Sequence, residues 1–223
     1  MERNKSEKRA SDSRLKTALE CAVEWWEEHG RNFPWRNTND PFRILIAELL
    51  LQRSRSGSVG PVYKDLFERW PTPADLKIAD IGSILAVIEP LGLQQRASRI
   101  KELASVWDGL DHVPTNVSEL LQLPGIGPYS AKATAAAMSW STEPPVDSVS
   151  SRVMKRLLGE RSHGKNDGEL ARSVYSHAPK RRWRDLNWAI LDIAAAVCMP
   201  KIPRCDVCPV SADCGSSNSS SKR

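Results

Sequence analysis

The chain has 223 residues, of which 40% are hydrophobic, a formal net charge of +5 and a pI near 9.0. This length and apolar content suffice for one substantial core arranged as one or two lobes, and the basic excess favours a polyanionic partner. The longest apolar run, residues 44–51, is interrupted by Glu48 and falls far short of the ~20 residues that span a bilayer, which excludes a membrane-spanning protein.

Three stripes of apolar residues at helical spacing, and no persuasive alternating strand, predict an all-helical protein with short connections. Residues 1–13 are charged and lack the roughly 7–15-residue apolar core of a secretory signal, so we expect a flexible basic tail and a reducing cytosol. Residues 215–223 are expected to form a flexible end. The stripes are Leu15, Leu19, Ala22, Val23 and Trp26; Ile78, Ile81, Ile84, Leu85 and Ile88; and Ile100, Leu103, Ala104 and Trp107.

Basic residues gather in three groups. Each group is typical either of a solvated face or of contact with phosphates. The groups are Arg53 with Arg55; Arg96, Arg99 and Lys101; and Lys180, Arg181, Arg182 and Arg184.

Glu48 lies among the apolar residues of the 44–51 segment. Apolar neighbours desolvate a carboxyl and favour its protonated form, so Glu48 is a candidate acid. The alternative is a buried glutamate that accepts hydrogen bonds from loop amides.

The run Leu123-Pro124-Gly125-Ile126-Gly127 separates an apolar helix from the Ala-rich segment 130–139. Two glycines one residue apart permit a sharp turn that directs free N–H groups of the next helix outward, an arrangement suited to a phosphate. The alternative is a tight turn between helices with no ligand.

Asp147 follows two prolines and Val146 and directly precedes a predicted helix. It is expected to cap the N-terminus of that helix, where the helix dipole keeps the carboxylate ionised. A capping role alone is the alternative to a catalytic one.

Four cysteines close the chain at spacings that favour a metal centre. A two-residue gap lets Cys205 and Cys208 reach one centre, with Cys198 and Cys214 on either side. A tetrahedral zinc site and two structural disulfides are the alternatives, and spacing alone does not distinguish iron from zinc.

Together, the Leu-Pro-Gly-Ile-Gly run, Tyr129, Val146-Asp147 and the cysteine spacing resemble the helix-hairpin-helix DNA glycosylases typified by endonuclease III and MutY. The resemblance extends from about Trp25 to Cys214. It implies two helical lobes with a DNA-binding cleft between them: a six-helix barrel with the hairpin (36–140), and a discontinuous lobe (14–35 and 141–214) whose cysteines hold a [4Fe-4S] cluster. Phe33-Pro34-Trp35-Arg36, Asp40-Pro41-Phe42 and Glu48-Leu49-Leu50-Leu51 also resemble the start of MutY-like members.

The resemblance also implies roles for single residues. Asp147 matches the catalytic aspartate, which stabilises the positive charge that develops on the sugar. Tyr129 stands where bifunctional members carry a Schiff-base lysine, which implies base removal without efficient strand cleavage. The residues assigned to DNA contact are Gln52 and Leu93, which match inserting side chains, the hairpin residues Gly125, Ile126 and Gly127, and the basic Arg53 and Lys132.

Two positions bear on the base that is removed. Trp188 replaces the glutamine with which adenine-removing MutY enzymes bind adenine, and no second domain of their kind follows Cys214. The run from Arg31 to Pro41 is similar to that of the mismatch-specific thymine glycosylases of archaea, but Val149 stands where asparagine is common, which indicates a retuned pocket.

The resemblance therefore implies a monomeric, cytoplasmic DNA glycosylase of base excision repair, which would be associated with the nucleoid in a prokaryote. Its partner would be double-stranded DNA with thymine or uracil mispaired with guanine. Adenine removal, opposite guanine or 8-oxoguanine, and a non-catalytic iron–sulfur DNA-binding protein are the alternatives.

Overall fold

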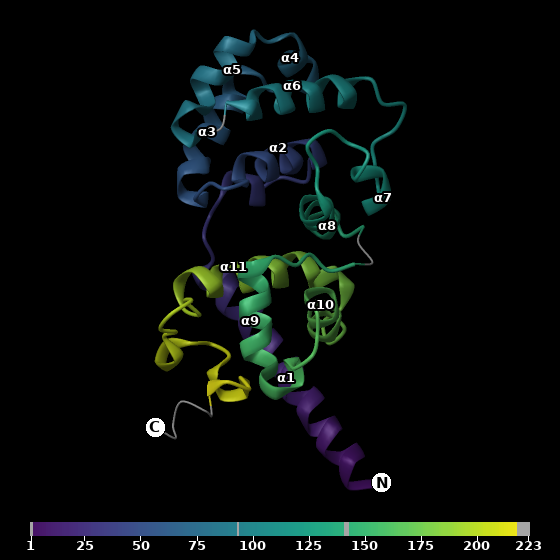
Figure 1. Ribbon diagram of the computed structural model, residues 1–223, viewed down its shortest axis with the longest axis vertical. Coiled ribbons are helices and arrows are strands. Elements are labelled where there is room, and N and C mark those ends of the chain that lie inside the picture. The colour runs from purple at the N-terminus through teal and green to yellow at the C-terminus, as the bar shows by residue number, and fades with distance from the viewer. Residues whose placement is uncertain (1, 93, 141–142, 218–223) are drawn as a thin grey trace. The chain divides into compact units, whose positions relative to one another are not determined.

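The computed structural model describes residues 2–92, 94–140 and 143–217, and within these ranges it contains helices and loops but no β-strand (Figure 1). The all-helical prediction is confirmed. None of the helices in these ranges is long and apolar enough to cross a membrane.

The chain divides into two compact units, one formed by residues 1–31 and 141–223 and the other by residues 32–140. We call them the discontinuous unit and the central unit. Each unit has a hydrophobic core of its own. The first boundary falls after Arg31, four residues before the position expected from the sequence.

The central unit is built around α2, whose apolar residues are almost all buried. Pro41 begins this helix, and Asp40 caps it by accepting hydrogen bonds from the N–H groups of Phe42 and Arg43. Helix α2 packs against α3, α6 and α8, so the residues that it carries lie next to the hairpin region. The helices of this unit are α2 (Pro41–Leu51), α3 (Ser56–Arg69), α4 (Pro73–Ile78), α5 (Ile81–Ile88), α6 (Gln95–Asp108), α7 (Val117–Leu120) and α8 (Pro128–Ala137), with short 3₁₀ turns at Pro34–Arg36 and Glu89–Leu91.

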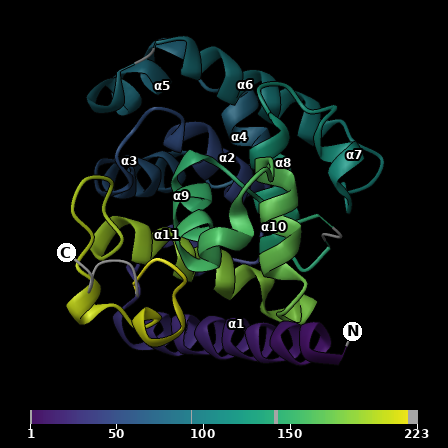
Figure 2. The ribbon, with the colours of Figure 1, turned by 60° about the horizontal axis from the view of Figure 1, so that its bottom comes forward.

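The discontinuous unit consists of α1 (Glu2–His29), α9 (Ser148–Leu158), α10 (Asp167–Tyr175) and α11 (Trp183–Ala196), followed by the cysteine-bearing loops. Helix α1 packs against α11, and α9 packs against both α10 and α11 (Figure 2). Leu15, Leu19, Ala22 and Val23 of the first apolar stripe are buried in this core, as predicted.

The expectation of a flexible tail over residues 1–13 is not met, because α1 begins at Glu2. No glycine or proline interrupts the chain before Gly30, and most of the residues of this segment form helices readily. The segment is also held from outside: Arg161 donates hydrogen bonds to the hydroxyl of Ser11 (2.7 Å) and to the carboxylate of Asp12 (2.8 Å).

The stripe from Ile78 to Ile88 is also not one helix. Helix α4 ends at Ile78, which is 81% exposed, and α5 begins at Ile81. Asp80 causes the break, because its carboxylate accepts a hydrogen bond from the N–H of Ser83 and caps the second helix. Ile84 and Ile88 are buried as predicted.

The expected flexible end is anchored over its first three residues. The N–H groups of Gly215 and Ser216 donate hydrogen bonds to the carbonyls of Leu157 and Arg156 near the C-terminus of α9. Gly215 lies so close to Gly159 that an added Cβ would stand 2.8 Å from the Gly159 nitrogen. Residues 218–223 lie outside the described residues.

Candidate active site and cysteine cluster

The hairpin between α7 and α8 has the sharp turn that its glycines predict. Gly125 adopts a φ of +75°, and a Cβ at this position would stand 3.1 Å from Cδ2 of Leu49. Gly127 is the N-cap of α8 and Pro128 follows at the first helical position, so no side chain caps this helix. The positive end of the dipole of α8 therefore lies directly after the hairpin, an arrangement that favours an anion.

Gln52, the C-cap residue of α2, is joined to this hairpin. Its side-chain amide donates to the carbonyl oxygen of Gly125 at 3.3 Å, and Arg99 donates to its Oε1 at 3.4 Å. Arg96 donates to the backbone carbonyl of Gln52 and, at 2.9 Å, to the hydroxyl of Ser54. The structure thus brings together Gln52 and the hairpin, which are both assigned to DNA contact.

Arg96 does not lie on a solvated face, because it is only 2% exposed. Burial, followed by the like charge of Arg99, lowers its pKa. A buried guanidinium that binds the turn after α2 fixes the backbone from which Gln52 and Arg53 project. Sequence reasoning missed this role, since the partners of Arg96 come from a distant segment.

The remaining predicted residues of the central unit lie on α2, on α8 and in the loops. Glu48 is half-buried on α2, and Tyr129 and Lys132 are half-buried on the first turns of α8, three residues apart. Arg53 is exposed, with a φ of +57°. Leu93 lies outside the described residues.

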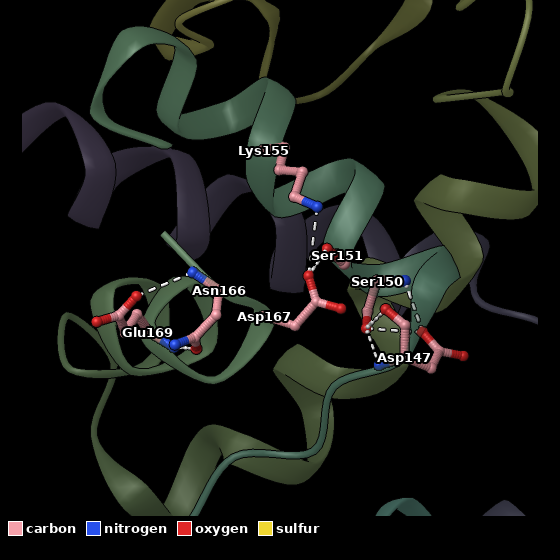
Figure 3. A network of polar contacts seen from close by, with 7 residues as sticks. All are labelled: Asp147, Ser150, Ser151, Lys155, Asn166, Asp167 and Glu169. Carbon is pink, nitrogen blue, oxygen red and sulfur yellow. Dashed lines mark hydrogen bonds and ion pairs between the residues drawn. The ribbon is translucent and has the colours of Figure 1, made fainter. Parts of the chain in front are cut away.

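Asp147 is the N-cap of α9, as predicted (Figure 3). Its Oδ1 accepts two hydrogen bonds from Ser150, one from the backbone N–H and one from the hydroxyl, both at 2.7 Å. The hydroxyl oxygen of Ser150 in turn accepts the backbone N–H of Asp147 at 2.9 Å. Among the described residues, no basic side chain forms an ion pair with Asp147 and no donor binds its Oδ2.

Tyr175 lies in the buried core within electrostatic reach of Asp147. Burial, followed by the negative charge of Asp147, raises the pKa of Tyr175. Its hydroxyl faces Oδ1 of the buried Asn187 at 3.4 Å.

The two residues assigned to the base pocket, Val149 and Trp188, both belong to the discontinuous unit. Val149 packs against the hydrophobic core of this unit. Its side chain has no polar atom and therefore offers no hydrogen bond to a base. Trp188 on α11 lies 5.6 Å from Trp26, measured between ring centroids, and the guanidinium of Arg184 stands 5.4 Å from the centroid of its ring. A cation over an aromatic face is a stabilising arrangement.

A second polar network lies beside Asp147 but does not include it (Figure 3). The hydroxyl of Ser151 donates to Asp167 at 2.6 Å, and Lys155 forms an ion pair with the same carboxylate at 3.3 Å. The hydrogen bond from Ser151, helped by Lys155, lowers the pKa of Asp167.

The four C-terminal cysteines are free thiols, and all four line one cavity of about 180 Å³. This volume is several times the roughly 30 Å³ that a water molecule takes up in the liquid. Burial raises the pKa of the Cys208 thiol to about 11. No group of three or more Cys, His, Asp or Glu side chains within the described ranges is arranged to hold one metal ion.

Two arginines of α9, which sequence reasoning missed, hold the loop that follows Cys198. Arg156 donates to Sγ of Cys198 at 3.3 Å and to the carbonyl of Met199 at 2.6 Å. Arg152 donates to the carbonyl of Cys198 at 3.1 Å. The helix that Asp147 caps therefore also supports the cysteine loops. Arg152 and Arg156 are four residues apart, which places them on the same face of a helix, and this spacing is the signal by which the sequence could have revealed them.

The sequence of residues 46–175, more than half of the chain, matches the HhH-GPD superfamily of base excision DNA repair proteins. The chain belongs to this superfamily. The matched segment includes the hairpin, Tyr129 and Asp147, and the cysteines lie beyond it.

Individual relatives of this HhH-GPD protein cover most of its length. It is 33% identical to a thymine/uracil-DNA glycosylase of Pyrobaculum aerophilum, over 86% of this chain and 87% of the relative. An adenine DNA glycosylase of Mycobacterium tuberculosis is 32% identical over 83% of this chain, which spans 63% of that relative. The solved structure of a thermostable thymine-DNA glycosylase superposes with a TM-score of 0.84, at 31% identity, over 94% of this chain and 99% of the other.

Proposed function

We propose that this protein is a monofunctional DNA glycosylase that hydrolyses the N-glycosidic bond of thymine or uracil mispaired with guanine. The observation that carries the proposal is the Asp147 carboxylate, held through one oxygen at a helix N-terminus with its other oxygen unbonded by the described residues, in a member of a base excision repair superfamily.

The proposed reaction breaks the C1′–N bond, whose electron pair leaves with the base. Positive charge then develops on the sugar, and a fixed carboxylate stabilises it more strongly than water would. Water adds to C1′ and releases one proton to solvent, from which Glu48 recovers the proton that it donates. Asp147 stabilises the charge and orients this water, and Glu48 is the proposed proton donor to the departing base.

The enzyme reaches the target base only after that base has rotated out of the DNA double helix. Gln52 is proposed to fill the space that the base leaves, next to the hairpin with which it shares a hydrogen bond. The uncapped N–H groups at the start of α8, with Lys132 on the same helix, are proposed to bind a backbone phosphate. Leu93 is also proposed to insert into the DNA, and this proposal rests on the sequence alone.

We further propose that Cys198, Cys205, Cys208 and Cys214 hold a [4Fe-4S] cluster with a structural role. The cavity that these thiols line has room for a group larger than a single ion. Arg156, beside Cys198, would compensate part of the negative charge of thiolate ligands. When bound, the cluster would tie the C-terminal loops to α9. The free thiols also fit a protein of a reducing compartment that contains DNA.

The choice of thymine or uracil rests on the relatives and on Trp188. The thymine/uracil-DNA glycosylase relative is 33% identical over 86% of this chain, and the solved thymine-DNA glycosylase superposes over 94% of it. An indole at position 188 supplies a stacking surface but lacks the paired donor and acceptor of an amide, so it does not replace a glutamine that binds adenine.

The test uses the purified protein with duplexes that contain G:T, G:U, A:G and A:8-oxoguanine pairs. Products are analysed with and without alkali. We expect excision of thymine and uracil, with strand breaks only after alkali. Excision confined to adenine would overturn the substrate assignment, and no excision from any duplex would favour a non-catalytic DNA-binding protein.

A further inference from the structure

We propose that the hydroxyl of Ser150 is the positioning group of Asp147, and that it directs Oδ2 of this carboxylate toward the substrate. The inference rests on the proposed function, in which Asp147 stabilises the sugar cation. The resemblance to the glycosylases assigns no role to Ser150.

The geometry begins with the hydrogen bonds between the two residues. The Ser150 hydroxyl has one proton, and two oxygens of Asp147 lie within reach: Oδ1 at 2.7 Å and the backbone carbonyl at 3.2 Å. The proton belongs on the shorter bond, whose acceptor is charged. The hydroxyl oxygen simultaneously accepts the backbone N–H of Asp147 at 2.9 Å. One hydroxyl thereby fixes both the backbone and the side chain of Asp147 (Figure 3).

The hydroxyl cannot be replaced by solvent. Ser150 is 0% exposed, whereas Asp147 is partly exposed. Since the Ser150 N–H also binds Oδ1, this oxygen accepts two short hydrogen bonds, while Oδ2 accepts none from the described residues. The two oxygens of the carboxylate therefore have different roles: Oδ1 is the anchor, and Oδ2 is left to face the developing charge.

The side chain of the neighbouring Val149 cannot hold the Asp147 carboxylate in place of Ser150. This side chain packs against the hydrophobic core and has no polar atom. Without Ser150, Asp147 would keep only one hydrogen bond to its side chain, the one from the backbone N–H at position 150. Its carboxylate would then be free to rotate, and a catalytic group that is not held in the productive geometry loses rate.

The test compares Ser150→Ala with Ser151→Ala. Both serines are nearly fully buried, but the hydroxyl of Ser151 binds Asp167 instead of Asp147. Excision is measured under single-turnover conditions, corrected for the active fraction, alongside affinity for mismatched duplex and the melting temperature. We expect Ser150→Ala to lower the excision rate about 10- to 100-fold, as expected for one lost hydrogen bond to a charged group, with unchanged DNA affinity. Ser151→Ala should lower the melting temperature similarly but keep its rate.

A second pair of variants distinguishes the loss of the hydroxyl from a defect in packing at position 150. Ser150→Thr and Ser150→Val add the same bulk and differ in the hydroxyl, so Thr should retain far more of the rate than Val. Equal rates for Thr and Val, or a full rate for Ser150→Ala, would overturn the inference. Asp147→Asn in the same assay separates the two proposals: an active Asp147→Asn contradicts the proposed function, whereas an inactive Asp147→Asn beside a fully active Ser150→Ala contradicts only the role of Ser150.

Discussion

The amide of Gln52 donates a hydrogen bond to the carbonyl of Gly125 at 3.3 Å, across 73 residues of sequence. The residue proposed to enter the DNA and the turn proposed to bind its backbone are therefore in contact within the central unit. Insertion of Gln52 requires that this hydrogen bond break. The cost is small, because the bond lies at an exposed site where water replaces the lost partner.

Gln52→Ala should lower the excision rate from mismatched duplex by about 10-fold or more, because nothing then fills the space of the extruded base and unstacking costs a few kcal/mol. The measurement is single-turnover excision from duplex. The matched control is the same thymine in single-stranded DNA, where no stack has to be opened. An equal loss on both substrates would contradict a wedge role.

The sequence was sufficient to predict the features that depend on local chemistry. Asp147 as a cap, the turn at Gly125 and the buried stripe of α6 all follow from residues close in sequence, and each is present in the structure. The helix formed by residues 2–13 was missed because a charged segment resembles a tail, whereas its absence of helix breakers and its contacts with Arg161 favour a helix.

Residues whose partners come from distant segments could not be predicted. Arg96 was assigned either to a solvated face or to phosphate contact, whereas it binds a carbonyl and a hydroxyl that lie more than 40 positions away in the sequence. Ser150 was detectable in principle, since a polar residue three positions after an N-cap is the signature of a capping box. The pattern does not reveal that its hydroxyl also binds the carboxylate.

Asp192→Asn should destabilise the fold. Asp192 is 1% exposed, and it accepts hydrogen bonds from the backbone N–H (2.8 Å) and the guanidinium (2.7 Å) of Arg31. The Arg31 side chain is 37% exposed, so water replaces part of the lost contact, and the expected cost is about 1–3 kcal/mol of unfolding free energy. The measurement is urea denaturation. Asp65→Asn, which breaks an exposed pair with Arg69, is the control and should cost less than about 1 kcal/mol. Similar losses in both variants would show that the Arg31–Asp192 pair contributes little.

Protein purified without oxygen should be brown, with broad absorbance near ~400 nm from thiolate-bound iron. Cys205→Ser should lose the colour, because Cys205 lines the cysteine cavity. Cys21→Ser is the matched control and should stay brown, since Cys21 lies on α1 and does not line this cavity. If the parent protein is colourless and contains stoichiometric zinc, the [4Fe-4S] proposal is wrong and the cysteines form a tetrahedral zinc site.

Asp147→Asn should reduce base excision at least about 100-fold while it largely retains binding to mismatched duplex. The amide keeps the shape of the side chain and an oxygen that can cap α9, but it loses the charge that stabilises the sugar cation. Excision and binding are measured on the same preparation, with circular dichroism as the check of fold. Normal excision by this variant would remove Asp147 from the mechanism.

Tyr129 is the residue that should separate base removal from strand cleavage. It occupies the second position of α8, directly after Pro128. A phenol forms no imine with the sugar, so the parent protein should leave intact abasic strands that break only in alkali. Tyr129→Lys places a primary amine at the position where bifunctional relatives carry theirs, and a neutral amine there can attack C1′ to form a covalent imine.

Borohydride reduces this imine and should therefore trap Tyr129→Lys, but not the parent, on DNA that contains a mispaired thymine. The substituted lysine must lose its proton, which desolvation by bound DNA favours, so the trapped fraction should rise with pH. Lys132 lies three residues further along α8 and is the internal control. Efficient trapping of the parent, abolished by Lys132→Ala, would contradict the monofunctional proposal and assign the amine to Lys132.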